Sequence, residues 1–374
     1  MDYAPLETQS HYLFPSSGYS HIVVNSNGDI MTESHQDAVA RHLCDTNQPL
    51  RPVLTSLNGD NSWLMSFPRP NMEQAATRKA FYHVAFEPWL RGPADVISPW
   101  LVHIETVNSP EISTFGSLEN VIRKIEQAAA VRLPTMEEGH ATQQSTASLL
   151  DAILLGFHYS DHLHPPTLKS FPPDIPVIAT RPGAEIIETW NHFKTVRVIN
   201  DLDPSATSWQ SPDLHPGEPL PKWLTPIFLP GSSILNFVFT IIWTHTVDGQ
   251  EVHEAILDSP HGIHLEEETF NAFGNSEPKT RKLAMLHGLK ENHTGGSMTT
   301  FGAKGGLGLY RKLGGVDHWV VSHSAEMAYS GLIMRVLWTV DTHRSIEWAL
   351  EKEQETDPDS DKYKRPNVVT VPNE

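Results

Sequence analysis

Short apolar runs separated by polar turns dominate the middle of the chain, and they predict a succession of buried strands. The run at 152–155 is wholly apolar, and the run at 236–243 is rich in β-branched and aromatic residues. An Asp-Gly pair at 248–249 separates the second run from another at 254–257, a pattern typical of a β-hairpin. Further strands are expected at 62–66, 82–86, 176–180, 195–199, 283–286 and 318–322.

Apolar residues at helical spacing alternate with these strands. They predict a helix over 117–130 with Ser117 as its N-cap. Other helices are expected over 183–193, 307–313 and 346–353. Because strands and helices are interleaved rather than grouped in blocks, the pattern indicates a layered α/β architecture.

The two ends of the chain differ from this middle. Residues 1–50 are polar and weakly periodic apart from an apolar run at 22–24, so we expect a partly irregular N-terminal extension. Residues 351–374 are rich in Glu, Lys, Asp and Pro, which predicts a disordered acidic tail. No repeat or clear break interrupts the remainder, and a single domain over 51–350 is the simplest interpretation.

Charge and composition exclude several classes of protein. The 27 Lys and Arg residues against 45 Asp and Glu give a net charge of −18, which argues against binding to nucleic-acid phosphates. The single cysteine, Cys44, excludes an intramolecular disulfide framework and a thiolate metal site. The first residues do not resemble a secretory signal, and the apolar stretch at 234–243 is too short to span a bilayer. We therefore expect a cytoplasmic protein that acts on a small molecule, without nucleic-acid or membrane partners; no pattern specifies an oligomeric state.

One segment concentrates the residues that carry chemistry. The apolar run at 152–155 leads into a turn that holds His158, His162 and His164 together with Asp161. Side chains at the end of a buried strand can converge on one metal ion. The same residues also fit a polar loop that caps the following helix, so both interpretations stay open. A metal held by the three histidines of this turn alone is disfavoured, because their spacing matches one face of neither a helix nor a strand.

The segment 154–164 resembles the first metal-binding motif of the metallo-β-lactamase superfamily, which has the form His-x-His-x-Asp-His after an apolar strand. A Glu-Pro-Trp-Leu-Arg-Gly turn at 87–92 is similar to the Asp-Pro-Trp-Leu-x-Gly turn of fungal members. Other similar segments, in the family's order, are the opening strand pair at 57–64, Leu-Asp-Ser-Pro-His-Gly at 257–262 and a late strand ending in His323. The resemblance covers about 54–334 and implies an αββα sandwich, with two mixed β-sheets packed face to face and helices outside.

This chain departs from the family motif at the first metal site. Phe157 and Tyr159 stand where the first two histidines belong, and Ser232 follows the Pro-Gly turn where the third is expected. Phenylalanine has no lone pair, and a tyrosine must ionise before it can replace an imidazole. The resemblance therefore implies that the first metal site is lost.

The ligands of the second metal site remain. Asp161, His162 and His323 match the family's positions, and His261 stands in place of the bridging aspartate. The resemblance thus implies one divalent ion held by these residues, with His261 as a fourth ligand or outside the coordination sphere. Zinc is favoured, and iron and manganese also suit imidazole and carboxylate ligands. A metal-free fold, in which the surviving His and Asp only form hydrogen bonds, is the competing interpretation.

The resemblance to fungal members of secondary metabolism implies a hydrolase or related lyase that acts on an ester, thioester or lactone of a small hydrophobic metabolite. The candidate proton carriers are Tyr159, His158 and Asp161, and the candidates to line the site are Phe157, Trp89 and His287. Tyr159 and Trp89 also fit ordinary core positions. The replaced histidines favour a function of another class: a metal-independent isomerase, cyclase or dehydratase, or a metabolite-binding scaffold. The Gly-rich run at 295–308 lacks the pattern of a phosphate loop and is expected to form a mobile lid or a connector.

Overall fold

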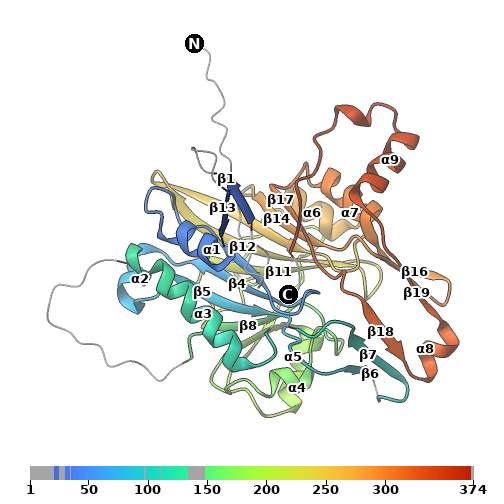
Figure 1. The fold of residues 1–374 in the computed structure, drawn as a ribbon, viewed down its shortest axis with the longest axis horizontal. Helices are drawn as coiled ribbons and strands as arrows, with labels where there is room; N and C mark the ends of the chain where they lie inside the picture. The colour runs from blue at the N-terminus through green and yellow to red at the C-terminus, as the bar shows by residue number, and fades with distance from the viewer. Residues whose placement is uncertain are drawn as a thin grey trace.

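The computed structural model describes residues 21–24, 30–33, 35–96, 98–110, 112–133 and 148–371. Residues 1–20 of the expected N-terminal extension lie outside these ranges. Within them, the strands form two six-stranded sheets and three smaller ones (Figure 1).

The first large sheet has the strand order β10-β9-β8-β5-β4-β3. Its strands β3, β4 and β5 pair antiparallel, whereas β5, β8, β9 and β10 run parallel to one another. Parallel strands end at a common edge of the sheet, and the turn that holds His162 leaves β8 at this edge. The bounds are β3 (Val53–Ser56), β4 (Trp63–Pro68), β5 (Phe81–Phe86), β8 (Ala152–Leu155), β9 (Val177–Thr180) and β10 (Val196–Ile199).

The second large sheet has the order β11-β12-β13-β14-β17-β20. Antiparallel pairing joins β11, β12 and β13, and parallel pairing joins β13, β14, β17 and β20. The carboxyl ends of β13 and β17 therefore lie at one edge, from which His261 and His323 follow. The bounds are β11 (Leu224–Pro230), β12 (Phe237–Val247), β13 (Gln250–Asp258), β14 (Arg281–His287), β17 (His318–Val321) and β20 (Val368–Thr370).

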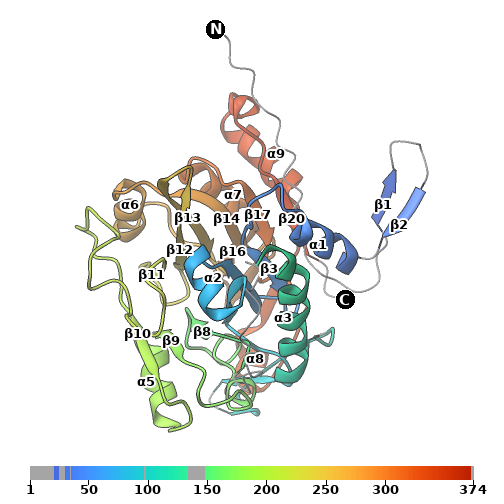
Figure 2. The ribbon, with the colours of Figure 1, turned by 90° about the vertical axis from the view of Figure 1, so that its left-hand side faces the viewer.

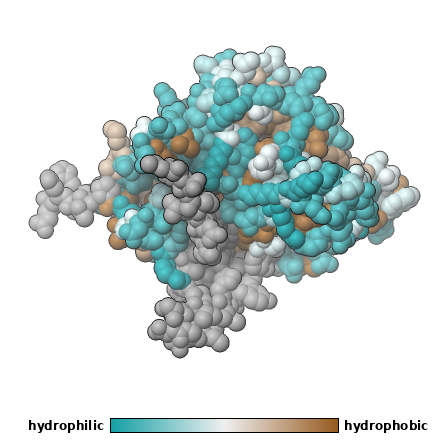
Figure 3. All heavy atoms as spheres, turned by 90° about the horizontal axis from the view of Figure 1, so that it is seen from above, coloured by the Kyte–Doolittle hydropathy of each residue, from teal (hydrophilic) through white to brown (hydrophobic). Residues whose placement is uncertain are grey.

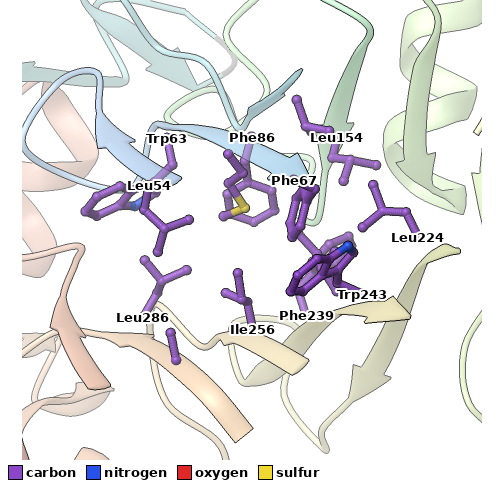
Figure 4. Packing of buried hydrophobic residues seen from close by; sticks show 14 of the residues in the cluster. Leu54, Trp63, Phe67, Phe86, Leu154, Leu224, Phe239, Trp243, Ile256 and Leu286 are labelled. Carbon is purple, nitrogen blue, oxygen red and sulfur yellow. The ribbon is translucent and has the colours of Figure 1, made fainter. Parts of the chain in front are cut away.

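The two sheets pack face to face around one apolar core. Trp63 and Phe86 of the first sheet point toward Ile256 and Leu286 of the second, and all four are almost fully buried (Figure 4). Burying such side chains stabilises each by about 1.5–3 kcal/mol relative to exposure. This central core fixes the distance between the sheets, and so the distance between the loops that leave their edges.

Helices cover the outer face of each sheet (Figure 2). On the first sheet, α3 (Phe115–Ala129) and α5 (Arg181–Thr189) bury their apolar faces in a second cluster. On the other, α6 (Glu268–Asn275), α7 (Gly302–Lys312) and α9 (Ile346–Thr356) build a third. The predicted αββα sandwich is confirmed.

Smaller elements surround this sandwich. The hairpin β1 (His21–Val24) and β2 (Ile30–Glu33) lies near the N-terminal end of the described residues. Two three-stranded sheets are β16-β15-β19, with β15 (Glu291–Thr294), β16 (Ser297–Phe301) and β19 (Thr339–Thr342), and β18-β7-β6, with β6 (Ala94–Val96), β7 (Val102–Thr106) and β18 (Met327–Ser330). The remaining helices are α1 (His35–Cys44), α2 (Asn71–Thr77), α4 (Pro165–Leu168) and α8 (Leu332–Leu337), with 3₁₀ turns at Ala130–Arg132 and Ser360–Lys362.

The hairpin predicted from Asp248 and Gly249 is confirmed, because both residues have positive φ and connect β12 to β13. Two other expectations are wrong in part. Residues 351–371 of the expected disordered tail are ordered, because α9 extends past residue 350 and β20 adds a parallel strand to β17, whereas 372–374 lie outside the described residues. The Gly-rich run is not a plain connector, because Gly295 and Gly296 form the β15–β16 turn and the later glycines lie in α7; that the run acts as a lid stays a prediction.

The surface combines hydrophilic areas with separate apolar patches, as the view from above illustrates (Figure 3). In the described part of the chain, no helix has the length and apolar character that crossing a membrane requires.

Candidate metal centre

Three histidines from separate segments meet at the edge of the sandwich. His162 lies in the turn between β8 and α4, His261 follows β13, and His323 follows β17. One ring nitrogen from each lies within 4.8 Å of the others. The ring centroids are 6.1 Å apart for His162 and His261, 5.4 Å for His162 and His323, and 4.7 Å for His261 and His323. The central core brings these residues together from both sheets.

The Nδ1 atom of each ring already has a partner. His162 Nδ1 donates to Glu87 Oε2 at 2.5 Å, and His323 Nδ1 donates to Asp60 Oδ2 at 3.0 Å. The same atom of His261 pairs with Thr300 Oγ1 at 2.9 Å. The nitrogen that remains on each ring is therefore Nε2. In His162 this atom is buried and has no hydrogen-bond partner among the described residues. Imidazoles held through one nitrogen with the other free are the usual arrangement of metal ligands.

Glu87, which accepts the hydrogen bond of His162, is itself held in place by several hydrogen bonds. Its Oε1 accepts a hydrogen bond from the backbone N–H of Gly156 at 3.0 Å, and Asn61 Nδ2 donates to its Oε2 at 2.5 Å. A Cβ on Gly156 would lie 3.1 Å from Glu87 Oε1 and 2.9 Å from the ring of Phe239, so the glycine permits this close approach. Glu87 also adopts a φ of +45°, a conformation that costs about 1 kcal/mol and often marks a functional position.

His323 is fixed by Asp60 from the β3–β4 loop. Besides accepting from the ring, Asp60 accepts from the backbone N–H of Ala325 through Oδ1 at 3.1 Å, and its carbonyl accepts from the N–H of His323 at 3.2 Å. His323 has a φ of +50°, so these bonds hold a strained backbone in place. Asn61 connects Glu87 with the segment of His323. Its Nδ2 donates to Glu87, and its Oδ1 accepts a hydrogen bond from Ser322 Oγ at 2.8 Å.

The electrostatics of the cluster favour a cation. Burial alone lowers the pKa of His162, but the carboxylates of Glu87 and Asp161 raise it to about 10. The site thus stabilises positive charge at this ring. The pKa of His261 lies well below its usual value, because of burial and then because of His323 and His162, so its lone pair is available at neutral pH. A metal ion would supply positive charge without requiring a proton on a ligand nitrogen.

Asp161 lies beside the three histidines without joining their set. Its Oδ2 is 3.7 Å from His162 Nε2, and its Oδ1 is buried with no hydrogen-bond partner in the described residues. The Asp161 carboxylate therefore lies beside the free imidazole nitrogen of His162. The structure brings together His162, His261 and His323 as the close group, with Asp161 next to it.

Of the predicted proton carriers, His158 is half-buried and Tyr159 packs partly against the central core. The pKa of His158 is lowered by burial and then by His162, which keeps its imidazole neutral. Phe157 contacts the cluster: its ring centroid is 5.2 Å from that of His162 and 4.6 Å from that of Tyr159.

Trp89 and His287 are both buried, and neither lines the cavity next to Phe157. Trp89 is buried, its indole N–H donates to Gly92 O at 2.8 Å, and its ring packs near His164, so it is a core residue. His287 is fully buried and its Nδ1 donates to Gly288 O at 2.7 Å. Burial lowers the pKa of His287 to about 4, with a smaller contribution from His323. His287 Nε2 is buried without a hydrogen-bond partner among the described residues, and its ring interacts electrostatically with His261 and His323; that Trp89 and His287 line the site stays a prediction.

The supporting residues Asp60, Asn61 and Thr300 were not predicted from the sequence, and Glu87 was noted only as a departure from the fungal turn. A local signal exists for two of them. Asp60 and Asn61 belong to a polar Asn-Gly-Asp-Asn turn that leads directly into a buried strand. Thr300 carries no comparable signal, since it is an ordinary strand residue of β16.

The known proteins to which this chain is similar are distant from it. No protein-family model matches the chain, and no curated protein matches it. A possible metal-dependent hydrolase from Veillonella parvula DSM 2008 is 10% identical over 87% of this chain and 98% of its own, with a TM-score of 0.45. An isothiocyanate hydrolase from Delia radicum gut bacteria is 12% identical over 86% and 96%, with a TM-score of 0.44. A metallo hydrolase from the archaeon Ignicoccus hospitalis KIN4/I is 10% identical over 86% and 94%, with a TM-score of 0.38. At these scores, the argument for function rests on the histidine cluster itself.

Proposed function

We propose that this protein is a metal-dependent hydrolase of the metallo-β-lactamase type, with one divalent ion held by His162, His261 and His323. The observation that carries the proposal is the pairing of all three Nδ1 atoms, with Glu87, Thr300 and Asp60, while a nitrogen from each ring converges within 4.8 Å. Three imidazoles with an adjacent carboxylate suit zinc best, and iron or manganese as alternatives.

Asp161 has two roles open to it in this proposal. Its unpartnered Oδ1 would complete the coordination as a fourth ligand, or hold a proton for the reaction. When bound, a divalent ion supplies Lewis acidity toward a substrate carbonyl oxygen and a nearby water. The neutral imidazole of His158 would accept or return a proton, and the rings of Phe157 and Tyr159 would limit access of bulk water.

The substrate class follows from the resemblance described above and from the apolar residues beside the cluster. We propose hydrolysis of an ester, thioester or lactone of a small hydrophobic metabolite, or a related lyase step, in secondary metabolism of a fungal type. A cytoplasmic location belongs to the same proposal.

Metal content tests this proposal directly. The protein is expressed with zinc, iron and manganese supplied, and the bound metal is measured by mass spectrometry. We expect about one metal per chain, and a loss of most of it in His162→Ala, His261→Ala and His323→Ala. The control is His192→Ala, since this half-buried histidine bonds only to Phe171 O at 2.9 Å among the hydrogen bonds described. Less than about a tenth of a metal per chain in the unmodified protein would refute the proposal.

A second function is favoured by the same aromatic residues. Phe157 and Tyr159 stand beside the cluster, and Phe157 lies in contact with His162. A metal-independent isomerase, cyclase or dehydratase, or a metabolite-binding scaffold, would use such an apolar wall without any ion. Turnover of substrate that persists in thoroughly chelated protein would favour this second function over the first.

A further inference from the structure

A cavity of about 530 Å³ lies on the side of Phe157 away from His162, and its lining includes Phe157 and His158. It lies between the carboxyl ends of β8, β9 and β10 on one side and β11 with the start of β12 on the other. Phe157, Ile199, Phe228 and Phe237 are among its walls, and Ile234 lies at its exposed margin. A cavity of this size accommodates a small organic molecule.

Three of the walls form a continuous aromatic surface. The ring centroid of Phe237 lies 5.3 Å from that of Phe157 and 5.1 Å from that of Phe228, with interplanar angles of 40° and 38°. Phe157 connects this surface to the metal centre, because its ring is also 5.2 Å from His162 and 6.3 Å from His261. None of His162, His261 and His323 lines the cavity, so Phe157 forms the wall between the cavity and the histidine cluster.

The cavity offers no buried charge to a ligand. Of its described lining residues, Arg181 and Asp201 are exposed and His158 is half-buried and neutral. The buried polar residues are already paired: Thr180 Oγ1 donates to Gly156 O at 3.3 Å, and Asn236 Nδ2 donates to Gly262 O at 3.3 Å. A charged group in the buried part of the cavity, away from the exposed Arg181 and Asp201, would lose its hydration without compensation, whereas an uncharged ring system would gain contacts with aromatic side chains.

From these observations we infer that the cavity binds an uncharged aromatic ring system, and that this ring anchors the substrate on the far side of Phe157 from the histidine cluster. The part of this inference that concerns the substrate rests on the proposed function, whereas binding of the ring system does not depend on it. The inference assigns substrate selection to Phe228, Phe237 and Phe157. Phe157 and the Pro230–Gly231 turn stand where other members of the resembled family hold their first metal ion. In this chain both are walls of the cavity, so the inference gives these segments a different role.

Binding of 2-naphthol to the full-length protein tests the inference without requiring turnover. Titration followed by naphthol fluorescence, in the presence of a chelator, is expected to give saturable binding of one molecule per chain. Phe228→Ala removes one aromatic face and should weaken binding about fivefold. Ile234→Glu places a carboxylate at the cavity margin without disturbing the core, since Ile234 is 58% exposed, and should weaken binding at least about tenfold.

The matched control is Val247→Glu, at a position that is 46% exposed at the far end of β12 and outside the cavity lining. It should bind 2-naphthol like the unmodified protein. Absence of saturable binding, equal weakening by Val247→Glu and Ile234→Glu, or tighter binding of 1-decanol than of 2-naphthol would overturn the inference. Metal content is measured on the same variants, so failure of ring binding with metal retained is distinguished from failure of the metal centre.

Discussion

Asp60 and His323 are separated by 263 residues, yet the carboxylate of the first holds the imidazole of the second at 3.0 Å. Burial alone raises the pKa of Asp60, but the ring of His323, and then Lys290, lower it to about 2. The carboxylate is therefore ionised at neutral pH and accepts a hydrogen bond from His323 Nδ1–H. This bond directs the other ring nitrogen of His323 toward His162 and His261. A carboxylate in this position also makes the imidazole a stronger ligand.

Asp60→Asn is expected to weaken zinc binding about tenfold to a hundredfold, because the amide accepts a weaker hydrogen bond from His323 and no longer carries charge. Affinity is measured by competition with a chromophoric chelator. Zinc affinity equal to that of the unmodified protein would show that Asp60 does not support the metal centre. Thermal unfolding of the metal-free variant serves as the check on its fold.

Glu87→Gln should have a similar effect through His162. Its matched control is Glu126→Gln, because Glu126 Oε1 also accepts from a buried histidine, His83 Nε2, at 2.9 Å, but lies away from the cluster. We expect Glu87→Gln to lower zinc affinity by at least about tenfold and Glu126→Gln to leave it unchanged. Equal losses in both variants would mean that general destabilisation, rather than positioning of His162, is the cause.

Glu254 leads to a prediction about pH. This buried carboxylate bonds to Arg51 at 2.7 Å and to His245 at 3.0 Å, and Arg281 lies at 3.4 Å. Burial by itself raises its pKa, but the bonds to His245 and Arg51 lower it to about 2, from 4.5. The interactions that lower this pKa stabilise the folded state in full when the pH is above 4.5, the pKa of the group in the unfolded chain. Their stabilisation is lost as the pH falls from 4.5 toward 2.

Glu254→Gln should therefore lower the free energy of unfolding by about 3 kcal/mol at pH 7, and the difference from the unmodified protein should shrink below pH 4.5. Urea unfolding between pH 7 and pH 3 measures this. Glu277→Gln is the control, since this side chain is 66% exposed and pairs only loosely with Lys279. A difference that stays constant across this pH range would contradict the assignment.

Replacing two helical glycines by alanine should change the free energy of unfolding in opposite directions. A Cβ on Gly306 in α7 would lie 2.4 Å from the Trp319 ring and 2.7 Å from His287 Nδ1, so Gly306→Ala should destabilise the fold by about 1–3 kcal/mol. A Cβ on Gly274 in α6 would meet nothing within 4 Å, so Gly274→Ala should stabilise it by about 0.5–1 kcal/mol. Urea unfolding of both variants measures these effects. A neutral Gly306→Ala would mean that Trp319 moves aside at no cost.

The sequence allowed much of the architecture to be predicted, because local patterns encode it. The apolar run of β8, the Asp248-Gly249 turn and the helical spacing of α3 each depend on neighbours in the chain. The turn containing His162 was recognised for the same reason. These features require no knowledge of which segments meet in space.

The supports of the site depend on long-range contacts and could not be predicted in the same way. Glu87 and His162 are 75 residues apart, and nothing in either local segment specifies their pairing. Thr300 reaches His261 only because the β15–β16 hairpin folds over the loop after β13. The aromatic cavity also combines four separate segments, so its walls could be identified only once the sheets were assembled.

The position of β20 has a consequence for the order of assembly during synthesis. About fifty further residues must be synthesised after its partner β17 (His318–Val321) before β20 (Val368–Thr370) is complete. The last residue of β17 lies only two positions before His323. Until β20 arrives, β17 has an unpaired edge that can join another nascent chain. Chaperones that shield such edges, or a slower rate of translation over 322–367, would therefore affect how much of the newly made protein completes the histidine cluster.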